Sequence, residues 1–294
     1  MTALAPSNEH ALERPRRIGL FGQLRRNPAV IGGAGVLAVL VAVALLAPYL
    51  HTVDPEFLKP RFRLKPPSAE WWFGTDALGR DNYSRVVYGA RISLVVGIAV
   101  ACFAIALGTT IGLVAGYIRL LDAIVMRVMD GLMAIPGILL AIALIALSKA
   151  SLGTVIVAIV VPEIPRVARL VRGVVLTIRE EPYVEAAIAA GTRLPLILWR
   201  HVLPNTIAPL IVQGTYIAAA AVLTEAILSF LGAGVPTEIP TWGNMMAEGR
   251  KVFQIAPWTI FFPGVCLAVC VFAINMLGDG LRDTLDPRLA KRFR

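Results

Sequence analysis

Residues 92–118 read ISLVVGIAVACFAIALGTTIGLVAGYI and contain no Asp, Glu, Lys or Arg. The run exceeds the roughly 20 apolar residues that a helix needs to cross the hydrocarbon core of a bilayer. Three further runs of this kind occupy residues 29–50, 206–231 and 252–278, and Glu225 is the one charged residue among them. The sequence therefore predicts an all-α integral membrane protein.

The composition agrees with burial in lipid, since 57% of the residues are hydrophobic and 16% are charged, against about 25% charged in soluble domains. The net charge of +9 would suit nucleic acid, but most Lys and Arg residues flank apolar runs, where anionic lipid headgroups attract them. Membrane lipid is therefore an expected partner, and nucleic acid is not. Cys102, Cys266 and Cys270 lie inside apolar runs and are expected to act as small buried hydrophobes.

Two weaker runs, 123–147 and 152–171, contain charged residues and bring the predicted number of membrane spans to six. An even number places both termini on one side, and the basic tails place that side in the cytoplasm. The first span is too long for the apolar part of a cleavable signal and is expected to stay in the membrane. The basic residues of the tails are Arg14, Arg16, Arg17, Arg25, Arg26, Arg282, Arg288, Lys291, Arg292 and Arg294.

The span prediction also sets the organisation of the chain, with no separate soluble domain. We expect a cytoplasmic tail at 1–27, a first span at 28–50, an extracytoplasmic loop at 51–91, a five-helix core at 92–280 that includes a cytoplasmic loop at 179–205, and a cytoplasmic tail at 281–294.

The residue types that catalysis requires are scattered or missing. The sequence contains no Gly-Lys-Ser/Thr phosphate loop, and its three histidines, His10, His51 and His201, lie far apart along the chain. No pair of them has the spacing of a metal site. We therefore expect no catalytic residue, no metal and no bound cofactor in this chain.

Three carboxylates within the predicted spans are candidates for a transport pathway or a gate: Asp130, Glu163 and Glu225. A charge at mid-bilayer costs roughly 2.5–3.5 kcal/mol on insertion scales, so such residues face protein or water. Each also has a structural interpretation. Asp130 could pair with Arg127 one helical turn earlier, Glu163 lies between two prolines that can kink a helix, and Glu225 could bond to a neighbouring helix near the outer interface.

The cytoplasmic loop at 179–205 predicts two short helices that meet at a corner. Glutamates precede an alanine-rich stretch that ends at Gly191, which is typical of a helix start and a glycine C-terminus. Thr192 then suits an N-cap, with Pro195 in the first turn of the second helix. Such a corner could fit a groove on a partner protein or lie on lipid.

The spacing of residues in this loop closely resembles the EAA loop of binding-protein-dependent ABC importer permeases. The matching residues are Glu185, Ala186, Ala187, Gly191, His201, Pro204 and Asn205. In that family the loop docks into a cleft of the ATP-hydrolysing subunit, so the resemblance implies that these residues couple the two subunits. Ala190 and the early Pro195 depart from the usual pattern.

Three more segments resemble the dipeptide, oligopeptide and nickel branch of these permeases. They are the outer loop at 73–94, the stretch 228–234 with Trp242, and the ending at 277–288. The outer loop and the Asp-Pro ending are similar to the "C" type partner of a heterodimeric pore.

The resemblance implies an ABC importer type I (MetI-like) permease fold and a peptide importer in the bacterial inner membrane. It implies a second homologous permease subunit, two ATP-binding subunits that use ATP and Mg, and an extracytoplasmic substrate-binding protein. Asp76, Arg80 and Trp242 would meet that protein or shape the pore mouth. Alternatives are the same importer type carrying nickel chelates or haem, an ion-coupled secondary transporter using Asp130, Glu163 and Glu225, and a membrane-embedded enzyme.

Overall fold

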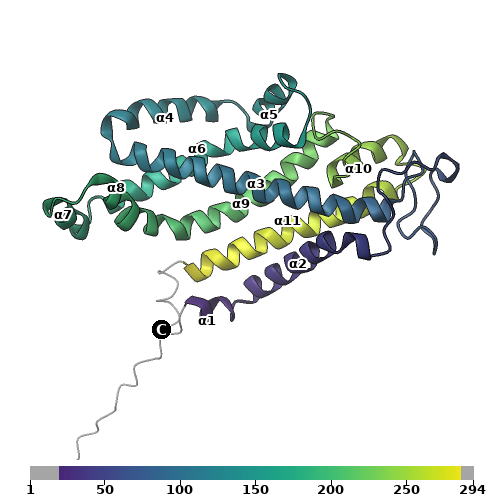
Figure 1. The fold of residues 1–294 in the computed structure, drawn as a ribbon, viewed down its shortest axis with the longest axis horizontal. Helices are drawn as coiled ribbons and strands as arrows, with labels where there is room; N and C mark the ends of the chain where they lie inside the picture. The colour runs from purple at the N-terminus through teal and green to yellow at the C-terminus, as the bar shows by residue number, and fades with distance from the viewer. Residues whose placement is uncertain (1–19, 286–294) are drawn as a thin grey trace, which may run out of the picture.

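The computed structural model describes residues 20–285, which form long helices joined by turns and one extended loop (Figure 1). Residues 1–19 and 286–294 lie outside the described part, and with them all the basic tail residues named above except Arg25, Arg26 and Arg282. The α-helices are α1 (Leu20–Leu24), α2 (Pro28–Leu45), α3 (Asn82–Tyr117), α4 (Arg119–Ala134), α5 (Gly137–Ala146), α6 (Leu152–Ile178), α7 (Pro182–Ala189), α8 (Leu194–Ile197), α9 (Leu203–Phe230), α10 (Trp242–Gly249) and α11 (Trp258–Leu285).

Within residues 20–285, four helical segments are long and apolar enough to cross a membrane: α2, α3, the continuous stretch from α8 through α9, and α11. Helices α4 and α5 meet at a bend of 88° and count as a fifth if they form one broken span. By length and composition, the structure therefore has four or five candidate spans within residues 20–285 and not the six that the sequence predicted. Helix α6, expected as the fourth span, has 27 residues but also four charged residues.

The ends of the spanning helices differ from the ends of the apolar runs. Helix α3 begins at Asn82, well before residue 92, because Asp81 caps it by accepting hydrogen bonds from the backbone N–H and the hydroxyl of Ser84. Helix α11 begins at Trp258 and continues to Leu285, past the predicted end at 278. Apolar length identifies the membrane-crossing part of a helix, whereas capping decides where the helix itself stops.

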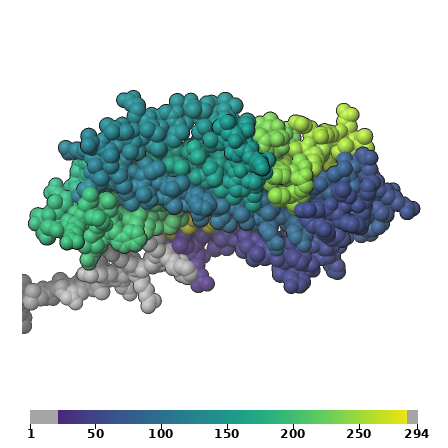
Figure 2. All heavy atoms as spheres, turned by 45° about the horizontal axis from the view of Figure 1, so that its top comes forward, coloured from purple at the N-terminus to yellow at the C-terminus, as the bar shows by residue number. Residues whose placement is uncertain are grey.

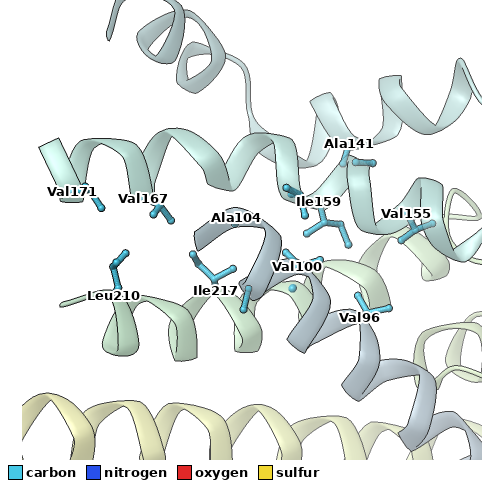
Figure 3. Packing of buried hydrophobic residues seen from close by; sticks show 14 of the residues in the cluster. Val96, Val100, Ala104, Ala141, Val155, Ile159, Val167, Val171, Leu210 and Ile217 are labelled. Atoms are coloured by element: carbon cyan, nitrogen blue, oxygen red, sulfur yellow. The ribbon is translucent and has the colours of Figure 1, made fainter. Parts of the chain in front are cut away.

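Helix α3 is the centre of the bundle and packs on α6 and α9, while α11 packs on α2 and α9. The main hydrophobic core lies between α3, α6 and α9 and consists mainly of their Val, Ile, Leu and Ala side chains (Figure 3). Helix α4 lies beside α3 and α6 (Figure 1). The α7–α8 region and the loop before α3 lie at opposite ends of the molecule, and both form part of its surface (Figure 2).

A row of glycines on α3 brings α6 unusually close. Gly108, Gly112 and Gly116 recur every four residues and face Val167, Val171 and Val175 of α6. A Cβ atom added at Gly112 would lie 2.6 Å from the carbonyl oxygen of Ala168. Small residues at this spacing let two membrane helices touch along their backbones. The close contact fixes α6, and α6 leads directly into α7.

Candidate functional site

The helical corner, defined as residues 179–205, connects α6 to α9 at one end of the bundle (Figure 1). Helix α7 starts with Pro182, whose missing N–H is no loss in a first turn. Its last residue is Ala189, and the chain turns at Gly191, which has a φ of 77°. The N–H of Gly191 donates to the carbonyl of Ile188, and the N–H of Thr192 to that of Ala187. These two bonds are the Schellman pattern. The predicted glycine ending of this helix is confirmed.

The second half of the corner differs from the prediction. Arg193, not Thr192, occupies the N-cap of α8, and it makes no side-chain capping bond. Pro195 is in the first turn, as predicted. Helix α8 then passes through a π-helical turn, Leu198–Val202, directly into α9. Pro204 cannot donate a backbone hydrogen bond in the next turn, and the helix changes its pitch locally just before it. The second arm of the corner is thus a direct extension of α9, whereas α7 is a separate helix.

Three buried side chains anchor the corner to the bundle. Val184, Ile197 and Val202 belong to the main hydrophobic core and are almost completely shielded from solvent. The opposite surface carries exposed apolar residues, of which Trp199 is 72% exposed. The others are Tyr183, Ile188 and Leu196. An exposed group of apolar side chains on a firmly anchored element is typical of a protein interface.

The predicted coupling residues converge on this corner. Glu185 and Ala186 are exposed and Ala187 is half-buried. Within residues 20–285, the carboxylate of Glu185 forms no ion pair, so it is available to a partner. Gly191 lies at the exposed tip, where nothing within 4 Å would meet an added Cβ atom.

The last three predicted coupling residues join the two arms of the corner. The side-chain amide of Asn205 donates to the carbonyl of His201 at 2.7 Å and to the hydroxyl of Tyr183 at 3.4 Å. The rings of Tyr183 and His201 have centroids 6.1 Å apart. Pro204 is exposed beside them. These contacts hold α7 against the start of α9.

The pathway candidates do not form one relay. Asp130 pairs with Arg169 of α6 at 2.5 Å, and not with Arg127 as predicted, because α4 lies along α6 and the long Arg169 side chain reaches across. Glu163 pairs with Arg166 on its own helix at 3.0 Å, and α6 stays a continuous helix through both neighbouring prolines.

Glu225 is completely buried within α9. Its Oε1 atom accepts a hydrogen bond from the Ser229 hydroxyl at 2.8 Å, while its Oε2 atom has no partner among the described residues. Glu225 and Ser229 both belong to α9, so this hydrogen bond lies within one helix. One interpretation of the sequence had expected a bond to a neighbouring helix. The three carboxylates therefore have three different partners.

A buried ion cluster, defined as Asp76, Arg80, Arg85 and Glu248, lies at the opposite end of the bundle. Arg80 bonds through Nε to Asp76 at 2.6 Å and through Nη2 to Glu248 at 2.5 Å. The Nη1 atom of Arg85 lies 2.9 Å from Asp76 and 3.1 Å from Glu248. Burial by itself lowers the pKa of Arg80, but the hydrogen bonds and charges of Glu248 and Asp76 outweigh it and raise that pKa. The cluster ties the loop before α3 to α10.

The sequence singled out Asp76 and Arg80 as outer-loop residues that would meet the binding protein or shape the pore mouth; both are instead buried in this cluster, and Arg85 and Glu248 were not among the candidates. Glu248 lies far along the chain from Asp76, so no local spacing connects the two. The one available signal is Arg85 itself: an arginine at the start of a long apolar helix requires a carboxylate partner.

Trp242 was predicted at the outer surface or pore mouth and is instead fully buried. Its indole N–H donates to the backbone carbonyl of Val86 at 3.1 Å, and its ring lies against Gly89 of α3. The side chain therefore packs α10 on α3. A tryptophan stabilises the fold more when its ring is buried and its N–H is hydrogen-bonded than when the side chain lies on the surface.

The cysteines follow their prediction only in part. Cys270 is buried, Cys266 is half-buried and Cys102 is exposed, and all three are free thiols. Among residues 20–285, no group of three His, Cys, Asp or Glu side chains is arranged to hold a metal.

Two protein-family models match this chain. The model described as "Binding-protein-dependent transport system inner membrane component" matches residues 108–291, and "N-terminal TM domain of oligopeptide transport permease C" matches residues 20–67. The chain belongs to the family of binding-protein-dependent transport permeases. Members are non-catalytic membrane subunits, and partner subunits hydrolyse ATP.

Several curated relatives are similar over nearly their whole length. The chain is 57% identical to a probable peptide ABC transporter permease protein, y4tQ, of Sinorhizobium fredii, over 91% of this chain and 92% of the relative. It is 42% identical to the dipeptide transport system permease protein DppC of Alkalihalophilus pseudofirmus, over 97% and 93%. It is 36% identical to the oligopeptide transport system permease protein OppC of Bacillus subtilis, over 92% and 88%.

A solved structure supports the fold. A chain of the MetNI methionine ABC transporter, in inward facing conformations, superimposes with a TM-score of 0.55 over 68% of this chain and 96% of that chain, at 21% identity. The predicted MetI-like architecture is consistent with this similarity, which at such identity concerns the fold alone.

Proposed function

We propose that this chain forms half of a pore through which a bacterial ATP-driven importer carries peptides across the inner membrane. The relatives described above are named for peptides, dipeptides and oligopeptides, which favours peptide over nickel chelates or haem. The observation that carries the coupling role is the exposed helical corner, whose second arm is continuous with α9 and which is anchored by Val184, Ile197 and Val202.

The same proposal assigns six spans, with α4 and α5 as one broken span and α6 as the fourth. At 1.5 Å per residue, the 27 residues of α6 extend about 40 Å, which is enough for a hydrocarbon core of about 30 Å. The charges of α6 are paired, which lowers the cost of placing them in the membrane. Both termini and the helical corner then face the cytoplasm, and the buried ion cluster lies on the outer side.

The expected assembly contains a second permease subunit, two ATP-binding subunits and an extracytoplasmic substrate-binding protein. The chain itself binds no cofactor in this proposal, and ATP with Mg acts in the partner subunits. The exposed Glu185 pairs with a basic group or with backbone donors in the ATPase cleft. Ala186 and Ala187 allow close approach, because their side chains end at Cβ.

Force passes from the ATPase to the pore through the continuous helix that begins at Leu194 and ends at Phe230. A rigid element transmits displacement, whereas a flexible tether absorbs it. When the ATPase subunits close, the corner moves with them, and α9 moves its neighbours α3 and α11.

The test is Gly191→Asp in the complete transporter reconstituted in lipid. An aspartate at the tip of the corner adds bulk and a negative charge to the surface that is proposed to meet the ATPase, and it strains a backbone position with positive φ, so substrate-stimulated ATP hydrolysis and transport should fall about tenfold or more. Gly232→Asp is the matched control, because Gly232 is also an exposed glycine with positive φ, 83°, but lies at the far end of α9. Undiminished transport by the Gly191 variant would refute the coupling role.

A further inference from the structure

Two hollows follow one another along α9, and both are lined by Gln213 and Tyr216. The larger hollow, of about 680 Å³, begins at Pro204 and Asn205 of the helical corner. The smaller hollow, of about 320 Å³, includes Leu223. Helix α9 lies between α6 and α11 (Figure 1), and residues of both neighbours complete the lining. The two hollows therefore form one groove, called the α9 groove below, with α9 as its floor.

The α9 groove is long enough to cross most of a membrane. Asn205 and Leu223, at its two ends, are about 18 residues apart on a helix, which corresponds to about 27 Å. The hydrocarbon core of a bilayer is about 30 Å thick. An extended chain of about eight residues has the same length. Both hollows also have the size of sites that hold small ligands, about 300–1,000 Å³.

Two amide side chains line the groove near mid-membrane depth. Gln213 in α9 and Asn275 in α11 each lie close to the middle of a 28-residue helix. Within residues 20–285, the Gln213 side chain makes no hydrogen bond, and Asn275 only donates, to the carbonyl of Val271 at 3.0 Å. The amide of Gln213 and the Oδ1 atom of Asn275 are not shielded by the chain. Because an unpaired amide in hydrocarbon is costly, this surface meets water or a polar partner.

The polar groups in the smaller hollow carry no net charge. Glu163 and Arg166 are its charged lining residues, and they pair with each other at 3.0 Å. Gln213, Tyr216 and Asn275 contribute dipoles only. A neutral polar surface favours a neutral polar chain over an ion.

The amides of Gln213 and Asn275 can each donate and accept hydrogen bonds, as the groups of a peptide backbone do. An extended peptide offers free N–H and C=O groups to such side chains. A helix of a partner protein does not, because its backbone groups are already bonded to one another. The unpaired amides therefore match an extended peptide better than a helix of the second permease.

We propose that the α9 groove is the part of the transport pathway that this chain supplies, and that Gln213 and Asn275 bind the backbone of an extended peptide there. The proposal rests on the peptide-importer function above and names the residues that contact the cargo. Since all peptides share the same backbone, these contacts do not select among side chains. Pro204 and Asn205 belong to both the groove and the helical corner, so a movement of the corner changes the shape of the groove directly.

The test is the reaction of introduced cysteines with a charged trimethylammonium methanethiosulfonate reagent. The complete transporter, with the three native cysteines of this chain replaced by alanine, carries either Gln213→Cys or Asn275→Cys. Ile211→Cys and Phe272→Cys are the matched controls, because these exposed residues lie on the same two helices and line neither hollow. The reaction is followed in detergent, first without nucleotide and then during ATP hydrolysis.

The groove cysteines should react at least about tenfold faster than the controls in one of these two states, because the reactive thiolate forms in water and not in an apolar environment. In that state, a peptide that the wild type takes up should slow the reaction several-fold at both positions, whereas free alanine should not. Dialanine, trialanine and pentaalanine are the peptides tried. Two cysteines on different helices keep the test valid if one variant does not assemble.

Three results would overturn the proposal. Equal rates at groove and control cysteines would show that the groove is not the water-filled surface. No reaction at groove cysteines in a transporter that still takes up peptide would mean that the second permease fills the groove. Reaction without protection by the peptide would exclude the peptide as its occupant. Failure of the wild type to take up any of the three peptides would instead refute the peptide-importer function itself, and this proposal with it.

The role of the amide is tested by two substitutions of one residue. Gln213→Leu keeps a side chain of similar size but removes the amide, so uptake by the reconstituted transporter should fall several-fold. Gln213→Asn keeps the amide and should retain most of the uptake. Equal uptake by the two variants would contradict hydrogen bonding between Gln213 and the peptide.

Discussion

Charge is used in opposite ways at the two ends of this molecule. At the helical corner, Glu185 is exposed and has no ion-pair partner among the described residues. At the other end, Asp76 and Arg80 are buried and hold two distant chain segments together. An exposed charge adds little to the stability of its own chain and remains available to a partner, whereas a buried one must be paired. The contrast indicates that the helical corner is available to bind a partner, whereas the buried ion cluster stabilises the fold of the chain itself.

Breaking the buried end should have the largest effect on stability. Asp76→Ala removes one of the two carboxylates that Arg80 and Arg85 share, so that Glu248 alone faces two buried arginines, and removing one member of a buried ion pair costs about 3–5 kcal/mol. Denaturant unfolding of the purified chain in detergent measures this free energy. Glu238→Ala, at an exposed position, is the control and should stay within about 0.5 kcal/mol of the wild type. A loss below about 1 kcal/mol for Asp76→Ala would mean that the cluster does not stabilise the fold.

The connection between α3 and the corner can be broken through the glycine row. Gly112→Leu forces a side chain into the backbone of α6, and overpacking of this kind typically costs about 1–3 kcal/mol. Unfolding of the purified chain measures the loss. Gly131→Leu is the matched control, because nothing within 4 Å would meet an added Cβ atom at Gly131. Equal stability of the two variants would contradict the close contact between α3 and α6.

The fold and the site were predictable from the sequence to different degrees. Apolar runs predicted the four clear spans, and the local pattern around Gly191 predicted the end of α7, because both signals depend on neighbouring residues. Thr192 was the wrong cap because its backbone N–H closes the end of α7 by donating to the carbonyl of Ala187, so α8 starts one residue later. Contacts between distant residues, such as Arg85 with Glu248 and Asp130 with Arg169, required the packing of helices. No spacing in the sequence encodes them.

At the helical corner, a variant of an exposed charge should change transport without changing stability. Glu185→Gln removes one exposed charge, so the free energy of unfolding should change by less than about 0.5 kcal/mol. Transport by the reconstituted complex should nevertheless fall several-fold, because the carboxylate is proposed to contact the ATPase. Glu238→Gln loses the same charge at an exposed position outside the corner and should transport normally. Equal transport by the two variants would argue against a role for Glu185.

The smallest expected effect concerns the exposed ion pair between α4 and α6. The side chains of Asp130 and Arg169 are 54% and 43% exposed, so a double-mutant cycle should give a coupling free energy of about 0.2–1 kcal/mol if this face meets water. The parallel cycle of Asp130 with Arg127 should give nearly zero. A larger coupling for Arg127 than for Arg169 would restore the pairing that the sequence predicted.

The most direct test of the account is cross-linking of the corner to the ATPase. In the complete transporter, with the three native cysteines replaced by alanine, Ala186→Cys should cross-link to an ATPase subunit with a short bifunctional thiol reagent. The yield should depend on ATP, and Glu238→Cys at the opposite end should give no such product. A Glu238 product equal to that of Ala186, or no ATPase product from Ala186, would contradict the claim that the helical corner is the coupling element.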